Sequence, residues 1–183
     1  MALAATDSRS ALAQTFEERL QLCLACHGEK GQSETADVPS LGGQPASYTL
    51  IQLYMFREKL RVAAPMNDMT EGLRDADLQK LADLMAKLPP PVAQEAVDPT
   101  RAPRAHALVV QHRCAFCHST NFSGNESVPR LAAQREDYLL KSLREYKSGE
   151  RREYQPIMVE VMRGLNDGDI VELAHFLART GPL

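Results

Sequence analysis

A motif of two cysteines and a histidine occurs twice in this chain, as CLACH at residues 23–27 and as CAFCH at residues 114–118. The two copies contain all four cysteines of the 183 residues. Cys-x-x-Cys-His is typical of covalent haem attachment, because two thiols one helical turn apart can each form a thioether to one porphyrin and the adjacent histidine can ligate the iron. The sequence therefore predicts two covalently bound haem c groups, one on Cys23, Cys26 and His27 and one on Cys114, Cys117 and His118.

Three other uses of these cysteines are less favoured than haem. A zinc ribbon pairs its Cys-x-x-Cys units across a short loop, whereas these units lie nearly half the chain apart. A thioredoxin-like redox motif lies beside strands, which the pattern of apolar residues does not indicate here. Structural disulfides would not require a histidine after each second cysteine.

Apolar residues at helical spacing predict helices over residues 12–25, 46–60 and 75–88 in the first half of the chain. The first of these helices carries the haem motif at its C-terminal end, and three prolines end the last one. Residues 63–69 are predicted to form a methionine-bearing loop between the second and third helices. A stretch rich in proline and alanine follows, which predicts a semi-rigid linker.

The second half repeats the first in the same order. A helix over residues 104–116 is predicted to end in the second haem motif, and a final helix is predicted over residues 169–179. Such a repeat indicates duplication of one domain. We predict an all-α fold of two tandem haem-binding domains related by this repeat, with a first domain at residues 1–90, a linker at residues 91–103 and a second domain at residues 104–183.

Besides its histidine, each haem iron has a second axial position, which can take methionine, histidine, water or nothing. Each half offers a methionine seven residues before the leucine that opens its last helix, and we therefore expect Met66 and Met158 to be these ligands. Met69 and Met162 lie in the same segments and remain alternatives. Two protein ligands leave the iron no position for a substrate, which favours electron transfer over catalysis.

A histidine that ligates a metal normally donates its other ring N–H to an acceptor such as a backbone carbonyl, which fixes its tautomer. Pro39 and Pro129 recur at nearly the same distance after the two motif histidines, and we expect them to place this carbonyl. Their alternative role is to shape a turn. His106, His112 and His175 have no counterpart in the other half and are expected to be structural.

Charge and hydropathy limit the partners. The net charge of −3 argues against nucleic acid. No apolar run approaches the roughly 20 residues that cross a bilayer, so any membrane association is expected through partners only. Residues 1–13 are too weakly apolar for the core of a signal peptide, although residues 11–13 (ALA) resemble a cleavage site, which indicates a trimmed or re-engineered N-terminus. Because haem is attached to this motif outside the bacterial cytoplasm, we expect a periplasmic location.

These features resemble the dihaem cytochrome c4 family, in which two class I cytochrome c domains lie in tandem. The resemblance runs from about Phe16 and rests on the paired haem motifs, the Pro-x-Leu-x-x-Gln loops, the tyrosine-bearing helices, residues 149–151 (GER) and the methionines before Leu-x-Asp-x-Asp. It implies a helical periplasmic electron carrier with His/Met ligation of both irons. It further implies two domains packed about a pseudo-twofold axis, with the haem propionates near the interface.

The first half departs from this pattern in three places, one of which is Leu84 where the second half has the aromatic Phe176. Residues 58–61 (EKLR) stand where the second half has residues 148–151 (SGER). Arg74 stands where a serine or threonine usually begins the last helix.

The function predicted is transfer of one electron per haem between a respiratory donor and a terminal oxidase or reductase. An alternative is an electron-accepting cytochrome subunit of a periplasmic oxidoreductase, such as a thiosulfate or other dehydrogenase. A dihaem enzyme is less favoured, because catalysis needs an open or unusual iron ligand with acid–base groups beside it. No catalytic residue is expected.

Overall fold

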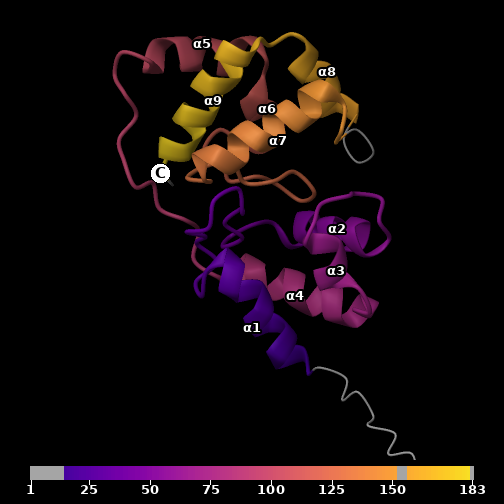
Figure 1. Ribbon diagram of the computed structural model, residues 1–183. Coiled ribbons are helices and arrows are strands. Elements are labelled where there is room, and N and C mark those ends of the chain that lie inside the picture. Colours follow the sequence, from indigo (N-terminus) through magenta and orange to yellow (C-terminus); the bar gives the residue numbers. More distant parts are fainter. Residues whose placement is uncertain (1–14, 152–155, 182–183) are drawn as a thin grey trace, which may run out of the picture.

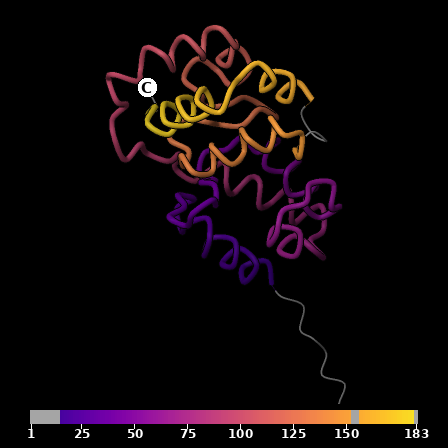
Figure 2. The backbone as a smooth tube through the Cα atoms, turned by 45° about the horizontal axis from the view of Figure 1, so that its top comes forward, coloured from indigo at the N-terminus to yellow at the C-terminus, as the bar shows by residue number. Residues whose placement is uncertain are grey.

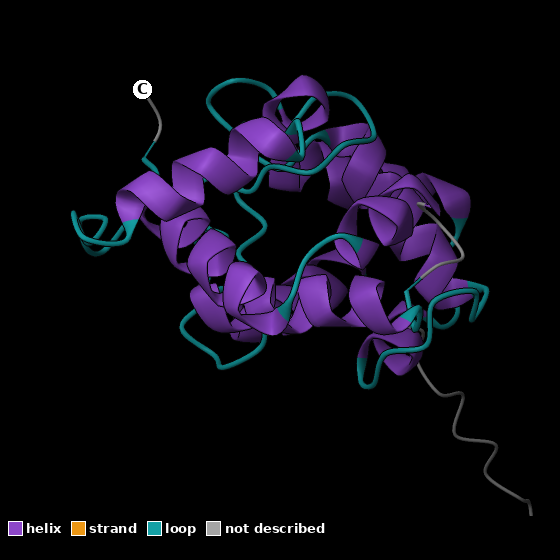
Figure 3. Cartoon of the chain, turned by 90° about the horizontal axis from the view of Figure 1, so that it is seen from above, coloured by secondary structure: helices purple, strands orange, loops and turns teal. Residues whose placement is uncertain are grey.

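The computed structural model describes residues 15–151 and 156–181 of the chain. Within these residues the chain forms helices joined by loops and no strand, as predicted (Figure 3). None of the helices in this part is long and apolar enough to cross a membrane. The predicted cleavage site at residues 11–13 lies outside the described residues.

The helices form two sets that follow each other along the chain and lie one above the other (Figure 1). The first set comprises α1 (Phe16–His27), α2 (Ala46–Arg57), α3 (Met66–Thr70) and α4 (Asp75–Lys87). The second set comprises α5 (Ala102–Gln111), α6 (Cys114–His118), α7 (Glu136–Ser148), α8 (Pro156–Arg163) and α9 (Asp167–Arg179). In both sets the tyrosine-bearing helix packs against the last helix, α2 on α4 and α7 on α9.

Local hydrogen bonds fix where several helices begin. At α1, the Thr15 hydroxyl accepts the N–H of Glu18, and the Glu18 carboxylate accepts the N–H of Thr15. Asn166 and Asp169 form the same reciprocal pair at α9. Such a capping box satisfies backbone N–H groups that have no partner inside the helix.

Helix α4, which begins after Arg74, has only one of the two hydrogen bonds of a capping box. Arg74 has no side-chain acceptor, but the Asp77 carboxylate accepts its backbone N–H at 3.1 Å and its Nε at 2.9 Å. The acidic partner therefore marks the start of the helix without a serine or threonine.

The predicted helix over residues 104–116 is wrong, because it is interrupted before the second haem motif. Helix α5 ends at Gln111, and Arg113 adopts a left-handed backbone with φ of 52° before α6 begins at Cys114. The first set has no such break, and α1 continues through His27. A left-handed residue cannot continue a right-handed helix.

The two predicted methionine loops are also partly helical. Helix α3 follows Pro65 directly, and α8 begins with Pro156. Proline favours the first turn of a helix, because its fixed φ suits the helix and its missing N–H would have no partner there. Each candidate axial methionine therefore lies on a short helix rather than in an open loop.

The backbone repeats even where the residue types differ. Gly149 adopts φ of 81° after α7, and Lys59 adopts φ of 56° at the equivalent place after α2. Gly43 and Ala133 form a second such pair, with φ of 64° and 54°. The departure at residues 58–61 is therefore accommodated by a left-handed lysine, which adopts the backbone conformation that glycine adopts in the second half.

The segment between the two sets runs beside the second set (Figure 2), and its residues Asp98 and Arg101 contact α9. The backbone N–H of Asp98 donates to Nε2 of His175 at 3.3 Å. Arg101 forms an ion pair with Glu172 at 2.9 Å. The linker is thereby held against the second set of helices, and His175 takes a structural role.

Two adjacent valines of α5 test the packing of the hydrophobic core in the second set of helices. Val109 is 8% exposed and packs in this core, whereas Val110 is 75% exposed. We predict that Val109→Ala lowers the free energy of unfolding of the holoprotein by about 2 kcal/mol, because two buried methyl groups are lost. Val110→Ala should change it by less than about 0.5 kcal/mol. Denaturant titrations measure both, and equal effects would contradict this packing.

Candidate haem sites

The end of α1 and the whole of α6 place the two motifs in the same arrangement. His27 and His118 are buried, with 6% and 5% of their surface exposed. The first cysteine of each motif is half-buried, the second is exposed, and no two of the four form a disulfide. Among the described residues no group of three or more His, Cys, Asp or Glu side chains is placed to hold a metal ion. The geometry gives no support to a cystine or to a zinc site built from all four cysteines.

A backbone carbonyl fixes the tautomer of each motif histidine. Nδ1 of His27 lies 2.8 Å from the carbonyl oxygen of Pro39, and Nδ1 of His118 lies 2.9 Å from that of Pro129. Since a carbonyl can only accept, each Nδ1 carries the hydrogen and each Nε2 keeps its lone pair. Burial lowers the pKa of both histidines, which favours the neutral ring that a metal requires.

The candidate methionines of each set lie three or four residues apart on one short helix. Met66 and Met158 are half-buried, as is Met69. Met162 is only 1% exposed and lies inside the second core. Thr70, also 1% exposed, occupies the position equivalent to Met162 in the first set. The repeat therefore pairs Met66 with Met158, whereas Met162 corresponds to a core threonine.

The loops after the two motifs meet between the two sets of helices. The backbone N–H of Ser40 donates to Oε1 of Gln134 at 2.8 Å, and Nε2 of Gln134 donates to the carbonyl of Ser40 at 2.9 Å. Arg130 and Gln44 form the same pair in the opposite sense, at 3.0 Å for both bonds. This reciprocal exchange is a pseudo-twofold contact. Both glutamines belong to the Pro-x-Leu-x-x-Gln loops.

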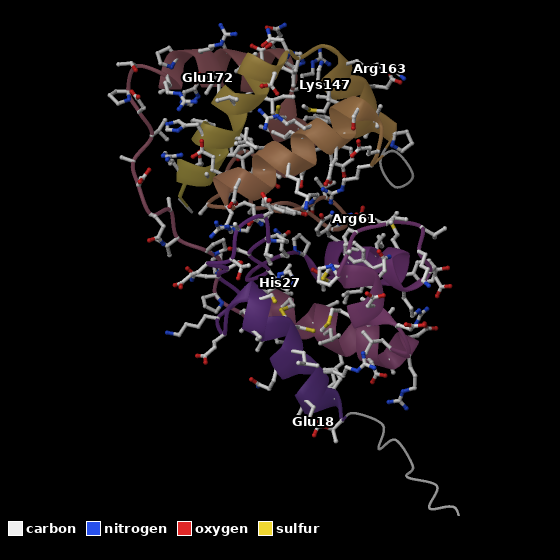
Figure 4. All side chains as sticks on the ribbon, in the orientation of Figure 1. Glu18, His27, Arg61, Lys147, Arg163 and Glu172 are labelled. Carbon is white, nitrogen blue, oxygen red and sulfur yellow. The ribbon has the colours of Figure 1, made fainter. Side chains whose placement is uncertain are left out.

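A cluster of arginines and tyrosines lies beside these loops. Arg151 donates to the hydroxyl of Tyr48 at 3.3 Å, and Arg61, which Figure 4 shows between the two sets, hydrogen-bonds Tyr138. Burial alone would raise the pKa of Tyr138, but the charges of Arg151 and Arg61 lower it to about 7. Among the described residues of this cluster, Glu145 is the carboxylate paired with an arginine, 3.9 Å from Arg151. Arg61 and Arg151 therefore bring more positive charge to the cluster than Glu145 balances.

Arg130 adds a buried guanidinium that forms no ion pair within residues 15–151 and 156–181. Its side chain is 6% exposed, and its Nε and Nη2 have no hydrogen-bond partner. Burial lowers its pKa, and an unpaired buried charge is costly. An anionic group at the interface would remove this cost. The propionates of haem are such groups. The motif cysteines therefore fit the thioether attachment of haem, and the interface arginines fit its carboxylates.

Sequence reasoning did not identify Arg61, Arg130 or Gln44 as part of the site. The repeat contained a signal for Arg61, which aligns with Arg151 two residues after the left-handed position. Arg130 gave no such signal, because its counterpart in the first loop is Ser40.

Comparison with known proteins identifies the family. The model of the Cytochrome c family matches residues 13–89 and again residues 103–181. Cytochrome c4 of Azotobacter vinelandii is 28% identical over 85% of this chain and 83% of its own length. The thiosulfate dehydrogenase electron acceptor of Thiomonas intermedia is 30% identical over 85% of this chain and 77% of its own. The crystal structure of reduced recombinant cytochrome c4 from Pseudomonas stutzeri superposes with a TM-score of 0.80 at 26% identity, covering 92% of this chain and 100% of that one.

Each match of the family model contains one set of helices and one haem motif. The predicted fold of two tandem cytochrome c domains is confirmed, and so are the two covalently bound haem c groups. The chain belongs to the cytochrome c family and is a dihaem electron-transfer cytochrome of the c4 type.

Proposed function

We propose that this protein carries electrons in the periplasm, one per haem, from a respiratory donor to a terminal oxidase or reductase. The two domains occupy residues 1–90 and 104–183, joined by the linker at residues 91–103. The observation that carries the proposal is the duplicated histidine site, in which a buried neutral ring donates Nδ1–H to a proline carbonyl. Cellular fractionation and reduction by a periplasmic extract test the location and the donor.

The proposed ligand sets are His27 with Met66 in the first domain and His118 with Met158 in the second. When bound, each haem iron supplies a one-electron couple. The histidine offers Nε2, whose basicity the Nδ1–H bond increases. The methionine would offer the iron a neutral thioether, which favours the ferrous state. The thiols of Cys23 and Cys26, and of Cys114 and Cys117, tether the two porphyrins.

Ligation from both sides suits a carrier for a physical reason. An iron that a buried histidine and a helical methionine both held would change its surroundings little between redox states. The arginines at the interface contribute fixed positive charge, so less solvent has to reorganise around the propionates. We assign Arg61, Arg151 and Arg130 to these carboxylates, because Arg130 in particular is buried with two unpartnered nitrogens.

A second candidate is the dedicated acceptor of a periplasmic dehydrogenase. It is favoured by the 30% identity to the thiosulfate dehydrogenase electron acceptor of Thiomonas intermedia. The haem chemistry is the same in both roles, and only the donor differs. Stopped-flow mixing of the oxidised protein with a thiosulfate dehydrogenase and thiosulfate distinguishes them, because a dedicated acceptor is reduced within a turnover of that enzyme.

The covalent attachment can be measured by mass. We predict that the chain retains the mass of two haems under denaturing acid conditions, because thioethers survive unfolding. Replacing Cys23 and Cys26 by serine should leave one haem, and so should replacing Cys114 and Cys117. A wild-type chain at its bare polypeptide mass would contradict the assignment.

The axial methionines can be tested one at a time. Met66→Ala and Met158→Ala should each lower the potential of one haem and abolish its share of the Met-ligation absorbance band near the red end. The neutral thioether that favours ferrous iron is then lost. Met69→Ala and the volume-conserving Met162→Leu are the matched controls and should keep the band. Loss of the band in a control, with retention in Met66→Ala or Met158→Ala, would reverse the assignment.

The assignment of Arg130 has a separate test. Arg130→Gln should lower the mean of the two midpoint potentials, because a buried positive charge favours the less positive ferrous haem. Arg144→Gln is the control, since Arg144 is exposed and already paired with Asp167. A spectroscopic redox titration measures both variants. An unchanged mean in Arg130→Gln would show that its guanidinium does not face a propionate.

A further inference from the structure

One peptide group in each domain makes two hydrogen bonds with different destinations. The carbonyl of the Pro39–Ser40 peptide accepts Nδ1–H of His27 at 2.8 Å, and its N–H donates to Gln134 of the second domain at 2.8 Å. The Pro129–Arg130 peptide likewise accepts from His118 at 2.9 Å and donates to Gln44 of the first domain at 3.0 Å. Each motif histidine is thus two hydrogen bonds from a side chain of the other domain.

We propose that the two glutamines are positioning residues that set haem potentials crosswise, Gln134 that of the first haem and Gln44 that of the second. The inference deepens the proposed function and rests on its assignment of His27 and His118 as iron ligands. The glutamines themselves touch neither the histidines nor the sulfurs of the motifs. They act through the peptide group that lies between.

The physical basis is polarisation along a hydrogen-bonded chain. An acceptor on the N–H of a peptide increases the negative charge on its carbonyl oxygen, so the carbonyl becomes a stronger acceptor. A stronger acceptor at Nδ1–H makes the imidazole a more basic ligand. A more basic ligand stabilises ferric iron and lowers the potential. Removing the glutamine should therefore raise the potential of the haem in the other domain.

Burial ensures that water cannot replace the missing acceptor. Gln44 and Gln134 are each 4% exposed, Ser40 is 3% exposed and Arg130 is 6% exposed. The orientation of each side-chain amide is also fixed, because its Nε2 donates to the carbonyl of the same residue whose N–H it accepts. In such low-dielectric surroundings a hydrogen bond has a larger electrostatic effect than in water.

The two glutamine Oε1 atoms differ in the number of backbone N–H groups that they accept. Oε1 of Gln134 also accepts the N–H of Arg135 at 3.0 Å, so it is shared between two donors. The equivalent residue after Gln44 is Pro45, which has no N–H to offer. The acceptor of the second domain's peptide is therefore undivided. We expect loss of Gln44 to have the larger effect.

The experiment compares Gln134→Leu and Gln44→Leu in the loaded protein. Redox titrations followed by the NMR resonances of each haem measure the two potentials separately, and single-methionine variants assign them. Gln134→Leu should raise the potential of the first haem, Gln44→Leu should raise that of the second by more, and the other haem should change little in each. Gln79→Leu, on the exposed face of α4, should shift neither.

Two further measurements show whether the hydrogen bond was broken and whether the proposed ligation holds. The amide protons of Ser40 and Arg130 should lose protection against exchange in Gln134→Leu and Gln44→Leu respectively, which shows that the bond was broken. The wild-type spectrum establishes His/Met ligation first, so failure of the proposed function is seen before any variant is made. The crosswise inference is wrong if a variant has lost the hydrogen bond of its glutamine and the potential of the haem in that glutamine's own domain shifts. It is also wrong if both potentials shift equally or if neither shifts.

Discussion

The hydrogen bond from a buried histidine Nδ1–H to a proline carbonyl is the interaction on which both halves of this molecule depend. It requires the chain to turn back so that a residue eleven or twelve positions after the histidine lies 2.8–2.9 Å from the ring. Loop backbone of the same shape achieves this in both domains, with Gly31 and Phe122 both left-handed at the turn. The bond leaves Nε2 with its lone pair and the ring neutral, which are the two conditions for an iron ligand.

The same loops join the domains, so cofactor binding and domain packing are not separate problems. The residue after each proline exchanges two hydrogen bonds with a glutamine of the other domain. Beside them, Arg61, Arg151 and Arg130 concentrate positive charge where haem carboxylates would balance it. The linker is held on α9, which keeps the second domain compact around its own larger core.

Short-range patterns in the sequence predicted most of the fold. The haem motifs and the helical periodicity depend on residues close together, the repeat depends on comparing the two halves, and the family comparison confirmed two cytochrome c domains. The break between α5 and α6 could not be predicted, because nothing in the residue type of Arg113 requires a left-handed backbone. The helices that carry the methionines could not be predicted from helical periodicity, because α3 and α8 contain only five and eight residues. The pairs across the interface join residues 86 and 94 positions apart and involve different residue types, so neither periodicity nor repeat could show them.

We propose that the protein closes each iron from both sides, so that electrons pass and small ligands do not bind. The most direct measurement is the absorbance spectrum of the fully reduced protein before and after carbon monoxide is added at neutral pH. Histidine and methionine on both irons predict an unchanged spectrum on the time scale of mixing. Rapid binding of carbon monoxide to either haem would contradict the account.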